Sequence, residues 1–243
     1  MRKSFTPSVG FFQNTVHASL NPTRTLDHWI PVLDRFTSAP LVAGNSKLAD
    51  NILIFDLPAI HTCMNCADCA ATCYAMKSQR LYKNTYNKRM INWFMAIHTP
   101  YQLMNTIVVQ VANLPKRTDN RRWYVRMHAS GDFFSQQYIT LWDSIVRDVN
   151  NIRQDIQFYF YTKVSHILDF SGLTGHHNVN LVESILPDGR VNFAPFEEAF
   201  EIAKETGVYV CPYRNPHLNG ELHRCGDTCT HCMHNKHVLF IKH

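Results

Sequence analysis

The hydrophobic positions of this chain change period several times along its length. From residue 51 onward, short apolar runs typical of buried strands alternate with longer segments of helical spacing. The clearest helix is predicted over residues 135–149. There the apolar residues recur at i, i+3, i+4 and i+7 on one face: Tyr138, Leu141, Trp142, Ile145, Val146 and Val149.

This pattern predicts the order of the elements. Strands are expected at 51–57, 123–128, 156–162, 179–182, 191–193, 208–211 and 238–241, and helices at 74–98, 101–113, 135–149 and 196–205. Alternating strands and helices favour right-handed crossovers and a parallel sheet. We therefore expect an α/β fold that forms a partial or full β/α barrel, with the cysteine loops at the carboxyl ends of its strands.

Length and composition limit the class of protein. The chain has 243 residues, of which 45% are hydrophobic and 18% charged, so it is expected to be globular. We expect one α/β domain over residues 51–243 and an N-terminal cover over residues 1–50, with a helix at 25–36. No apolar run reaches the roughly 20 residues of a membrane span, and Pro7, Gly10 and Gln13 interrupt any export signal. A cytoplasmic protein without membrane contact is therefore expected.

The cysteines fall into two sets of four. The first set is Cys63, Cys66, Cys69 and Cys73, and the second is Cys211, Cys225, Cys229 and Cys232. In a reducing cytoplasm, clustered cysteines are metal ligands or redox groups rather than disulfides. The C-x2-C-x2-C-x3-C spacing of the first set favours a [4Fe–4S] cluster over a zinc site, which typically uses two separated ligand pairs.

The second cysteine set leaves its metal open. Its spacing suits either iron–sulfur or zinc, and the neighbouring histidines His223, His231, His234 and His237 keep zinc as an alternative. Eight thiolates would suit two metal centres. Whether one or two clusters form is left open by the sequence.

Positive charge is concentrated in one segment of the chain. The formal net charge is +5, and the stretch from Ala70 to Thr118 contains no acidic residue but has these basic ones: Lys77, Arg80, Lys83, Lys88, Arg89, Lys116 and Arg117. The segment Lys77–Arg122 therefore predicts a nucleic acid or another polyanion as partner. Two alternatives are that its charge neutralises an anionic cluster, or that it is the solvated side of an amphipathic helix.

A glycine-containing turn follows the second predicted strand. Its sequence, His128-Ala-Ser-Gly-Asp132, lies between that strand and the helix at 135–149. Gly131 allows close approach of a ligand to the backbone, and the helix start favours an anion. The alternative is an ordinary tight turn in which Asp132 or Ser135 caps the helix.

Several polar side chains are expected at the carboxyl ends of the strands. Cys63 follows the first strand, His128 and Asp132 follow the second, and Lys163 ends the third. Sites in parallel α/β folds lie at this edge. His128, Asp132 and Lys163 are therefore the candidate catalytic residues, although the sequence does not establish that the protein is an enzyme.

Taken together, these motifs resemble the gene product 88-like family of bacteriophage proteins. The matching segments are Gly44–Lys47, Leu57–Ala59, Thr62-Cys63, Cys69–Ala75, His128–Phe133, Tyr161–Lys163, Cys211-Pro212 and the terminal cysteine cluster. The resemblance spans about residues 44–243. It implies a phage origin, and hence the cytoplasm of an infected host cell, without implying an activity.

A more distant resemblance is to radical S-adenosylmethionine enzymes. Their cysteine loop follows the first strand and their glycine-rich acidic turn follows the second, the places that Cys63–Cys73 and Ser130-Gly131-Asp132 occupy here. By this resemblance, Ser130, Gly131 and Asp132 would bind S-adenosylmethionine, with Asp132 at its amino group. Such an enzyme needs one iron free of thiolate, so Cys66 would be the cysteine that does not bind the cluster.

Three functions follow from these observations. The first is a radical-type iron–sulfur enzyme acting on a nucleotide, nucleic acid or peptide. The second is a non-catalytic cluster protein that binds nucleic acid through its basic segment. The third is a zinc-stabilised protein that binds a host factor. The order of the elements and the placement of the site favour the first, and saturation by eight cysteines favours the second.

Overall fold

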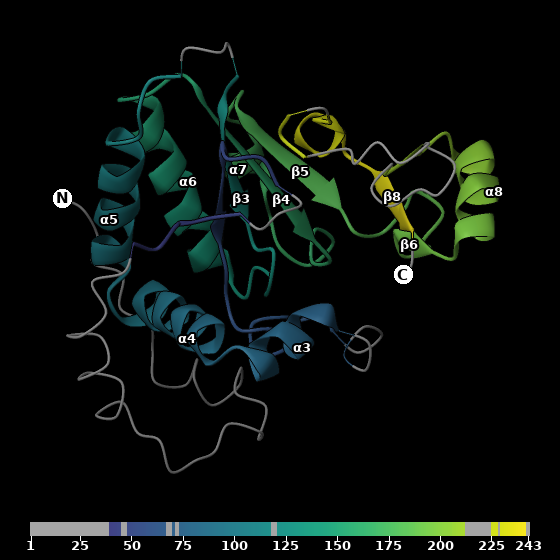
Figure 1. The fold of residues 1–243 in the computed structure, drawn as a ribbon, viewed down its shortest axis with the longest axis horizontal. Coiled ribbons are helices and arrows are strands. Elements are labelled where there is room, and N and C mark those ends of the chain that lie inside the picture. The colour runs from purple at the N-terminus through teal and green to yellow at the C-terminus, as the bar shows by residue number, and fades with distance from the viewer. Residues whose placement is uncertain are drawn as a thin grey trace.

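The computed structural model describes residues 39–44, 48–66, 70, 73–117, 121–211, 225–227 and 229–241. The predicted helix at 25–36 and most of the N-terminal cover lie outside these residues, as does Cys69. Figure 1 shows long helices on one side of a sheet, further helices beneath it, and the C-terminal strands with another helix on the other side.

A five-stranded sheet forms the centre of the molecule. Its order is β1 (Val42–Ala43), β2 (Ile52–Phe55), β3 (Trp123–Met127), β4 (Ile156–Thr162) and β5 (Val179–Glu183). Strands β2 to β5 are parallel and β1 is antiparallel to β2. The expected α/β fold with a mostly parallel sheet is thus confirmed, whereas closure into a barrel stays a prediction. Because β1 pairs with β2, the sheet includes residues that we had assigned to the N-terminal cover.

The helices pack on one face of this sheet. They are α3 (Tyr74–Leu81), α4 (Lys83–His98), α5 (Pro100–Ala112), α6 (Gln136–Asn150) and the single turn α7 (Ser171–Thr174). Apolar residues of α4 to α7 form the main core with alternate residues of β2, β3 and β4, among them Phe55, Val125 and Phe158, whereas α3 packs against α4. None of the helices within the described ranges is long and apolar enough to cross a membrane.

Local sequence explains where two of these helices begin. Ser135 precedes α6 in an extended conformation, and its side chain accepts a hydrogen bond from the Tyr138 amide at 3.2 Å. Pro100 is the first residue of α5, a position whose backbone N–H has no partner within a helix, so the missing N–H of proline is tolerated there. The predicted helix at 74–98 is in fact two helices, because Tyr82 adopts an extended conformation between α3 and α4.

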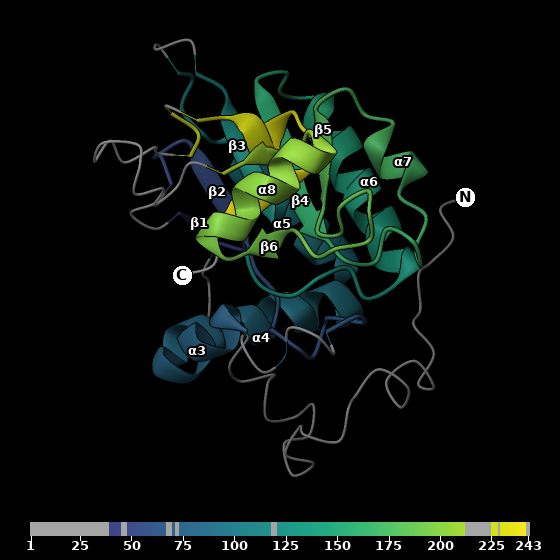
Figure 2. The same cartoon turned by 90° about the vertical axis from the view of Figure 1, so that its right-hand side faces the viewer.

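A smaller unit follows β5 and carries the C-terminal strands. It contains a three-stranded parallel sheet in the order β6 (Phe193–Ala194), β8 (Val238–Ile241) and β7 (Tyr209–Val210), together with α8 (Phe196–Thr206). Figure 2 shows α8 in front of these strands. A parallel bridge between Glu183 and His237 joins the end of β5 to the start of β8.

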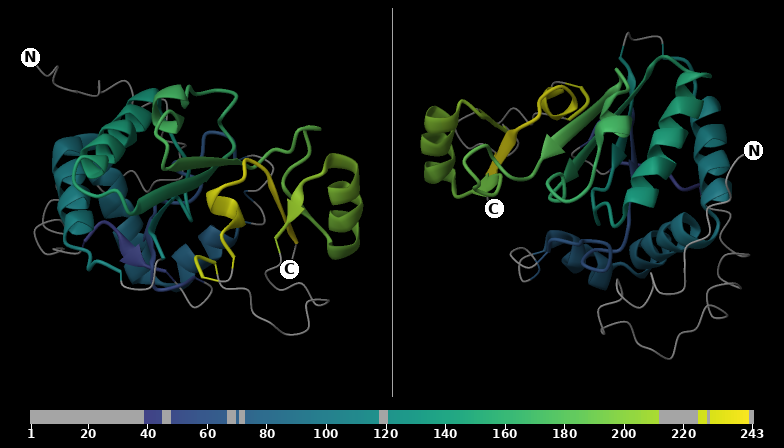
Figure 3. Two further views of the ribbon diagram at one scale, coloured as in Figure 1. Left: turned by 90° about the horizontal axis from the view of Figure 1, so that it is seen from above. Right: turned by 180° about the vertical axis from the view of Figure 1, so that it is seen from behind.

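The face of the main sheet opposite the helices is partly covered by the C-terminal segment. We call it the tyrosine face, because Tyr124 of β3 and Tyr159 and Tyr161 of β4 lie on it. The short 3-10 helix η2 (His231–Met233) packs there, and the Gln157 side chain donates to the Met233 carbonyl at 3.2 Å. Figure 3 shows this yellow segment beside the sheet from above and from behind.

Candidate functional site

The turn after β3 is fixed to the end of β2. The Ser130 amide donates to Asp56 Oδ1 at 3.0 Å, and the Ser130 hydroxyl donates to the Leu57 carbonyl at 2.9 Å. Gly131 has φ +81°, and a Cβ at this position would lie 2.5 Å from Thr62 Oγ1 and 2.6 Å from Leu57 Cβ. Glycine is therefore required here, because the segment that leads into Cys63 lies directly against it.

Asp132 joins the end of β3 to the end of β4. Its Oδ1 accepts bonds from the Phe133 amide at 2.7 Å and from Thr162 Oγ1 at 2.8 Å, and its Oδ2 accepts one from the Lys163 amide at 2.9 Å. Burial raises the pKa of Asp132 to about 6, against the lowering effect of these donors. The carboxylate is thus buried and already occupied by three protein donors.

Replacing Asp132 by Asn should reveal this structural role. The new amide nitrogen would face the Lys163 N–H, so one hydrogen bond would become a contact between two donors. We expect the free energy of unfolding to fall by about 1–3 kcal/mol in urea titrations. Asp169→Asn is the matched control, because Asp169 is exposed and should change stability by less than about 0.5 kcal/mol. Unchanged stability of Asp132→Asn would instead leave the carboxylate free for a ligand.

His128 points into the main core. It is 4% exposed, its Nε2 lies 2.8 Å from the Tyr138 hydroxyl, and its ring meets that of Phe133 edge-on at 4.5 Å. Burial lowers the pKa of His128 to about 3, so the imidazole is neutral near pH 7. This candidate catalytic residue therefore lies beneath α6 and away from the tyrosine face.

The first cysteine loop crosses the carboxyl edge of the sheet. Cys63, Cys66 and Cys73 are half-buried, and Cys69 lies outside the described residues. The Asn65 amide donates to the Lys163 carbonyl at 3.4 Å, and the Tyr74 hydroxyl donates to the Ala129 carbonyl. The loop therefore meets the ends of β3 and β4, where the sequence predicted that it would lie together with Lys163.

The second cysteine set gathers at the tyrosine face. Cys225 and Cys232 pack against the cluster that contains Tyr159, and Cys211 and Cys232 share a second apolar cluster with Val238. Burial raises the pKa of Cys232 to about 11, while the Tyr161 hydroxyl and the charge of Arg126 act in the opposite direction. The C-terminal thiols thus approach one another and a cation.

The described thiols of the two sets are not arranged as a preorganised metal site. Among the residues that the structure describes, no group of three or more His, Cys, Asp or Glu side chains is placed to hold a metal ion. Cys69, the third cysteine of the first set, lies outside the described residues. Metal binding by either set accordingly stays a prediction.

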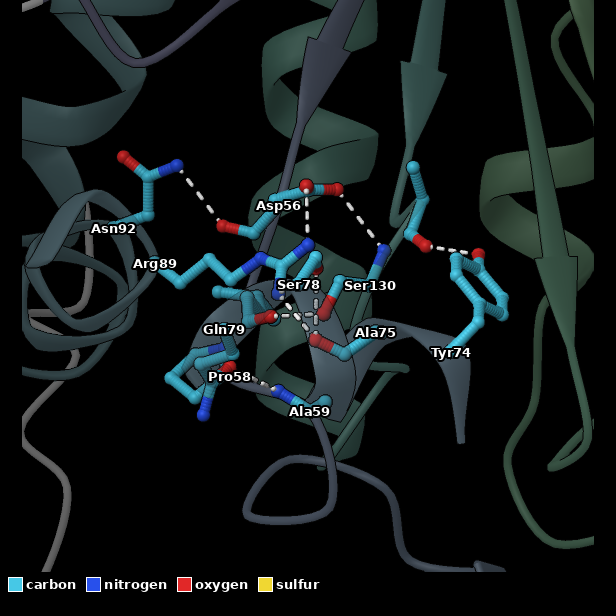
Figure 4. A network of polar contacts seen from close by, with 12 residues as sticks. Asp56, Pro58, Ala59, Tyr74, Ala75, Ser78, Gln79, Arg89, Asn92 and Ser130 are labelled. Carbon is cyan, nitrogen blue, oxygen red and sulfur yellow. Dashed lines mark hydrogen bonds and ion pairs between the residues drawn. The ribbon is translucent and has the colours of Figure 1, made fainter. Parts of the chain in front are cut away.

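The basic segment is not one continuous surface. Arg89 is 5% exposed and forms an ion pair with Asp56 at 3.3 Å, and its guanidinium also donates to the Ala75 carbonyl at 2.9 Å (Figure 4). Lys77 and Lys83 are exposed near the carboxyl ends of the strands, whereas Arg122 immediately precedes β3 at the amino ends. Part of the segment is therefore structural, and its exposed charges are divided between opposite edges of the sheet.

Sequence reasoning missed the importance of Arg126. This residue of β3 lies on the tyrosine face, with its guanidinium 5.0 Å from the centre of the Tyr161 ring. The sequence shows one charged residue within the otherwise apolar strand Trp123–Met127. Arg126 comes two positions after Tyr124, so both side chains lie on the same face of the sheet. Among the described residues, no carboxylate is within ion-pair distance of it.

Comparison with known proteins identifies the family. The family model described as Gene product 88 matches residues 35–192, more than half of the chain. The Gene 88 protein of Mycobacterium phage D29 is 27% identical over 184 residues, which cover 68% of this chain and 74% of that protein. The Gene 88 protein of Mycobacterium phage L5 is 31% identical over 137 residues, which cover 54% of each chain.

The family match contains part of the candidate site. It includes the first cysteine set, β2 to β5 and Arg126, and it ends before Cys211 and the rest of the second set. No solved structure matches the chain, so the likeness to radical S-adenosylmethionine enzymes stays a prediction. The resemblance to the phage family is confirmed, and the chain belongs to the Gene product 88 family of bacteriophage proteins.

Proposed function

We propose that this chain is an iron–sulfur protein whose first cysteine set binds a [4Fe–4S] cluster at the carboxyl edge of the parallel sheet. One observation supports this most directly. The first cysteine segment meets the ends of β3 and β4, because the Asn65 amide donates to the Lys163 carbonyl at 3.4 Å and the Tyr74 hydroxyl donates to the Ala129 carbonyl. Sites in parallel α/β folds lie at this edge of the sheet, and the spacing of the four cysteines suits a [4Fe–4S] cluster.

The cysteine thiolates of the first set are suitable ligands for such a cluster. Cys63, Cys66 and Cys73 lie in one half-buried loop, and Cys69 completes the spacing. A bound cluster would supply one-electron transfer. The second set, in which Cys211 and Cys232 share an apolar cluster, would hold a second cluster or zinc and fix the C-terminal segment to the tyrosine face.

Radical-type catalysis is the first use that we propose for the cluster. It is supported by the sequential order of β2 to β5, by the cysteine loop after β2, and by the polar side chains on the face that the helices leave free. The substrate would be a nucleotide, a nucleic acid or a peptide. S-adenosylmethionine would be the partner of the cluster in this reaction.

A specific observation favours a non-catalytic cluster as the second candidate. Ser130 and Asp132 are both bonded to protein groups, so neither presents a free side chain for direct contact with S-adenosylmethionine. Gly131 is covered by Thr62. A non-catalytic protein would use its exposed basic residues on α3 and α4, Lys77, Arg80 and Lys83, to bind nucleic acid.

Metal analysis of anaerobically purified protein tests the proposal. We expect iron and sulfide in the wild-type protein, and in Cys73→Ser the loss of the share of iron, sulfide and brown colour that belongs to the first cluster. Cys232→Ser is the matched control, because it removes a thiol from the second set only. Stoichiometric zinc without sulfide, from cells grown with ample iron, would refute the [4Fe–4S] assignment.

A second pair of measurements separates the two uses of the cluster. A radical-type enzyme should retain its cluster in Cys66→Ala, and its reduced wild-type form should convert S-adenosylmethionine to 5′-deoxyadenosine. A closed, four-thiolate cluster should be lost in Cys66→Ala, and the reduced protein should leave S-adenosylmethionine intact. Binding of the non-catalytic form to nucleic acid should weaken with added salt.

A further inference from the structure

Arg126 holds an unusual position for an arginine. Its neighbours in register are Ile54 on β2 and Tyr159 on β4, so it lies in the middle of the sheet rather than at an edge. Its Nε atom is fully buried and has no hydrogen-bond partner. A buried N–H donor without an acceptor destabilises the folded protein unless a ligand supplies that acceptor.

The nearest carboxylate does not supply the missing partner. Asp56 is close enough to influence Arg126 electrostatically, but its Oδ2 pairs with Arg89 at 3.3 Å and its Oδ1 accepts the Ser130 amide at 3.0 Å. Burial raises the pKa values of Tyr159 and Tyr161, so both phenols stay neutral near pH 7. The charge of Arg126 is therefore left without a direct counter-charge among the described residues.

The surroundings of Arg126 suit recognition of a ligand. The Tyr161 ring lies 5.0 Å from the guanidinium carbon and supports one face of the group. A guanidinium held by its face still offers its edge for two parallel hydrogen bonds to a carboxylate or phosphate. Arg126 as a whole residue is half-buried, although its Nε atom is covered.

We propose that Arg126 anchors a binding site for a small-molecule anion, bearing a carboxylate or phosphate group, on the tyrosine face. The anion accepts two hydrogen bonds from the guanidinium edge, and Tyr161 holds the guanidinium in place. The site does not depend on the proposed cluster, because the groups that form it belong to β3 and β4. The tyrosine face, on which the C-terminal cysteines lie, would therefore bind a small anion.

Binding of inorganic phosphate and of succinate to the full-length, anaerobically purified protein tests this proposal. At constant ionic strength in chloride, at least one probe should bind the wild-type protein saturably in calorimetry, and the better one identifies the ligand class. Arg126→Gln should weaken that binding at least tenfold. The matched control is Arg147→Gln, which removes an exposed arginine on α6 and should leave binding unchanged.

A measurement on the wild-type protein guards against misfolding of the variant. Phenylglyoxal modifies accessible arginines, and the bound probe should protect Arg126 but not Arg147 from it, as read by mass spectrometry. The proposal is overturned if neither probe binds saturably, if Arg126→Gln binds as the wild type does, or if neither probe protects Arg126. Iron content recorded for each sample separates these outcomes from failure of the proposed cluster.

Discussion

Replacing Arg89 by Met is expected to lower the free energy of unfolding by about 3–5 kcal/mol. The Arg89 side chain is buried, and its guanidinium pairs with Asp56 and donates to Ala75 and Ser78 at 2.9 and 3.3 Å. Its removal leaves the Asp56 carboxylate without its direct ion-pair partner in a buried position. Figure 4 shows that this group joins β2 to α3, α4 and the turn after β3.

Urea titration followed by circular dichroism measures this effect. Arg147→Met is the control, because Arg147 is exposed and its pair with Asp143 at 3.5 Å should contribute less than about 0.5 kcal/mol. Adding Asp56→Asn to Arg89→Met should recover part of the loss, since the unpaired charge is then removed. A loss below about 1 kcal/mol in Arg89→Met would contradict the importance of this ion pair.

The second large effect concerns acid. Because burial lowers the pKa of His128 from 6.5 to about 3, the folded state resists protonation of this side chain. The contribution of the neutral His128 to the free energy of unfolding is fully present above pH 6.5. It is lost as the pH falls toward 3. The complete loss would amount to about 4–5 kcal/mol, at about 1.36 kcal/mol for each pKa unit.

Stability measured between pH 7 and pH 4 tests the role of His128. His128→Asn suits the left-handed backbone of this residue, at φ +62°, and does not titrate in this range. The variant should be less stable than the wild type at pH 7 yet lose less stability on acidification. His177→Asn, at an exposed position, should keep the wild-type slope. Equal slopes for His128→Asn and the wild type would refute a buried neutral imidazole.

Much of the main sheet was predictable because local pattern determines it. The runs at 51–57, 123–128, 156–162 and 179–182 correspond to β2, β3, β4 and β5, and the spacing in 135–149 identified α6. The interruption at Tyr82 was missed, since neither proline nor glycine marks it. Strands β6 and β7 are only two residues long, and pairing with β8 rather than local propensity determines their positions.

The candidate site was predictable in its parts and not in its arrangement. Sequence spacing identified Ser135 as a possible cap and placed the first cysteine loop at the carboxyl ends of the strands. It did not show that His128 enters the core, that Arg89 pairs with Asp56, or that Arg126 lies over the Tyr161 ring. These contacts join residues distant in sequence, so they follow from tertiary packing alone.

The strand order of the smaller sheet has a consequence for synthesis on the ribosome. Strand β8 is the central strand, with β6 and β7 on either side, although it is the last of the three to be translated. Residues 193–210 therefore wait with unpaired edges until residues 238–241 leave the exit tunnel, whereas the strands of the larger sheet can already pair. A translational pause after β7 would prolong the exposure of these edges to aggregation or to host proteases.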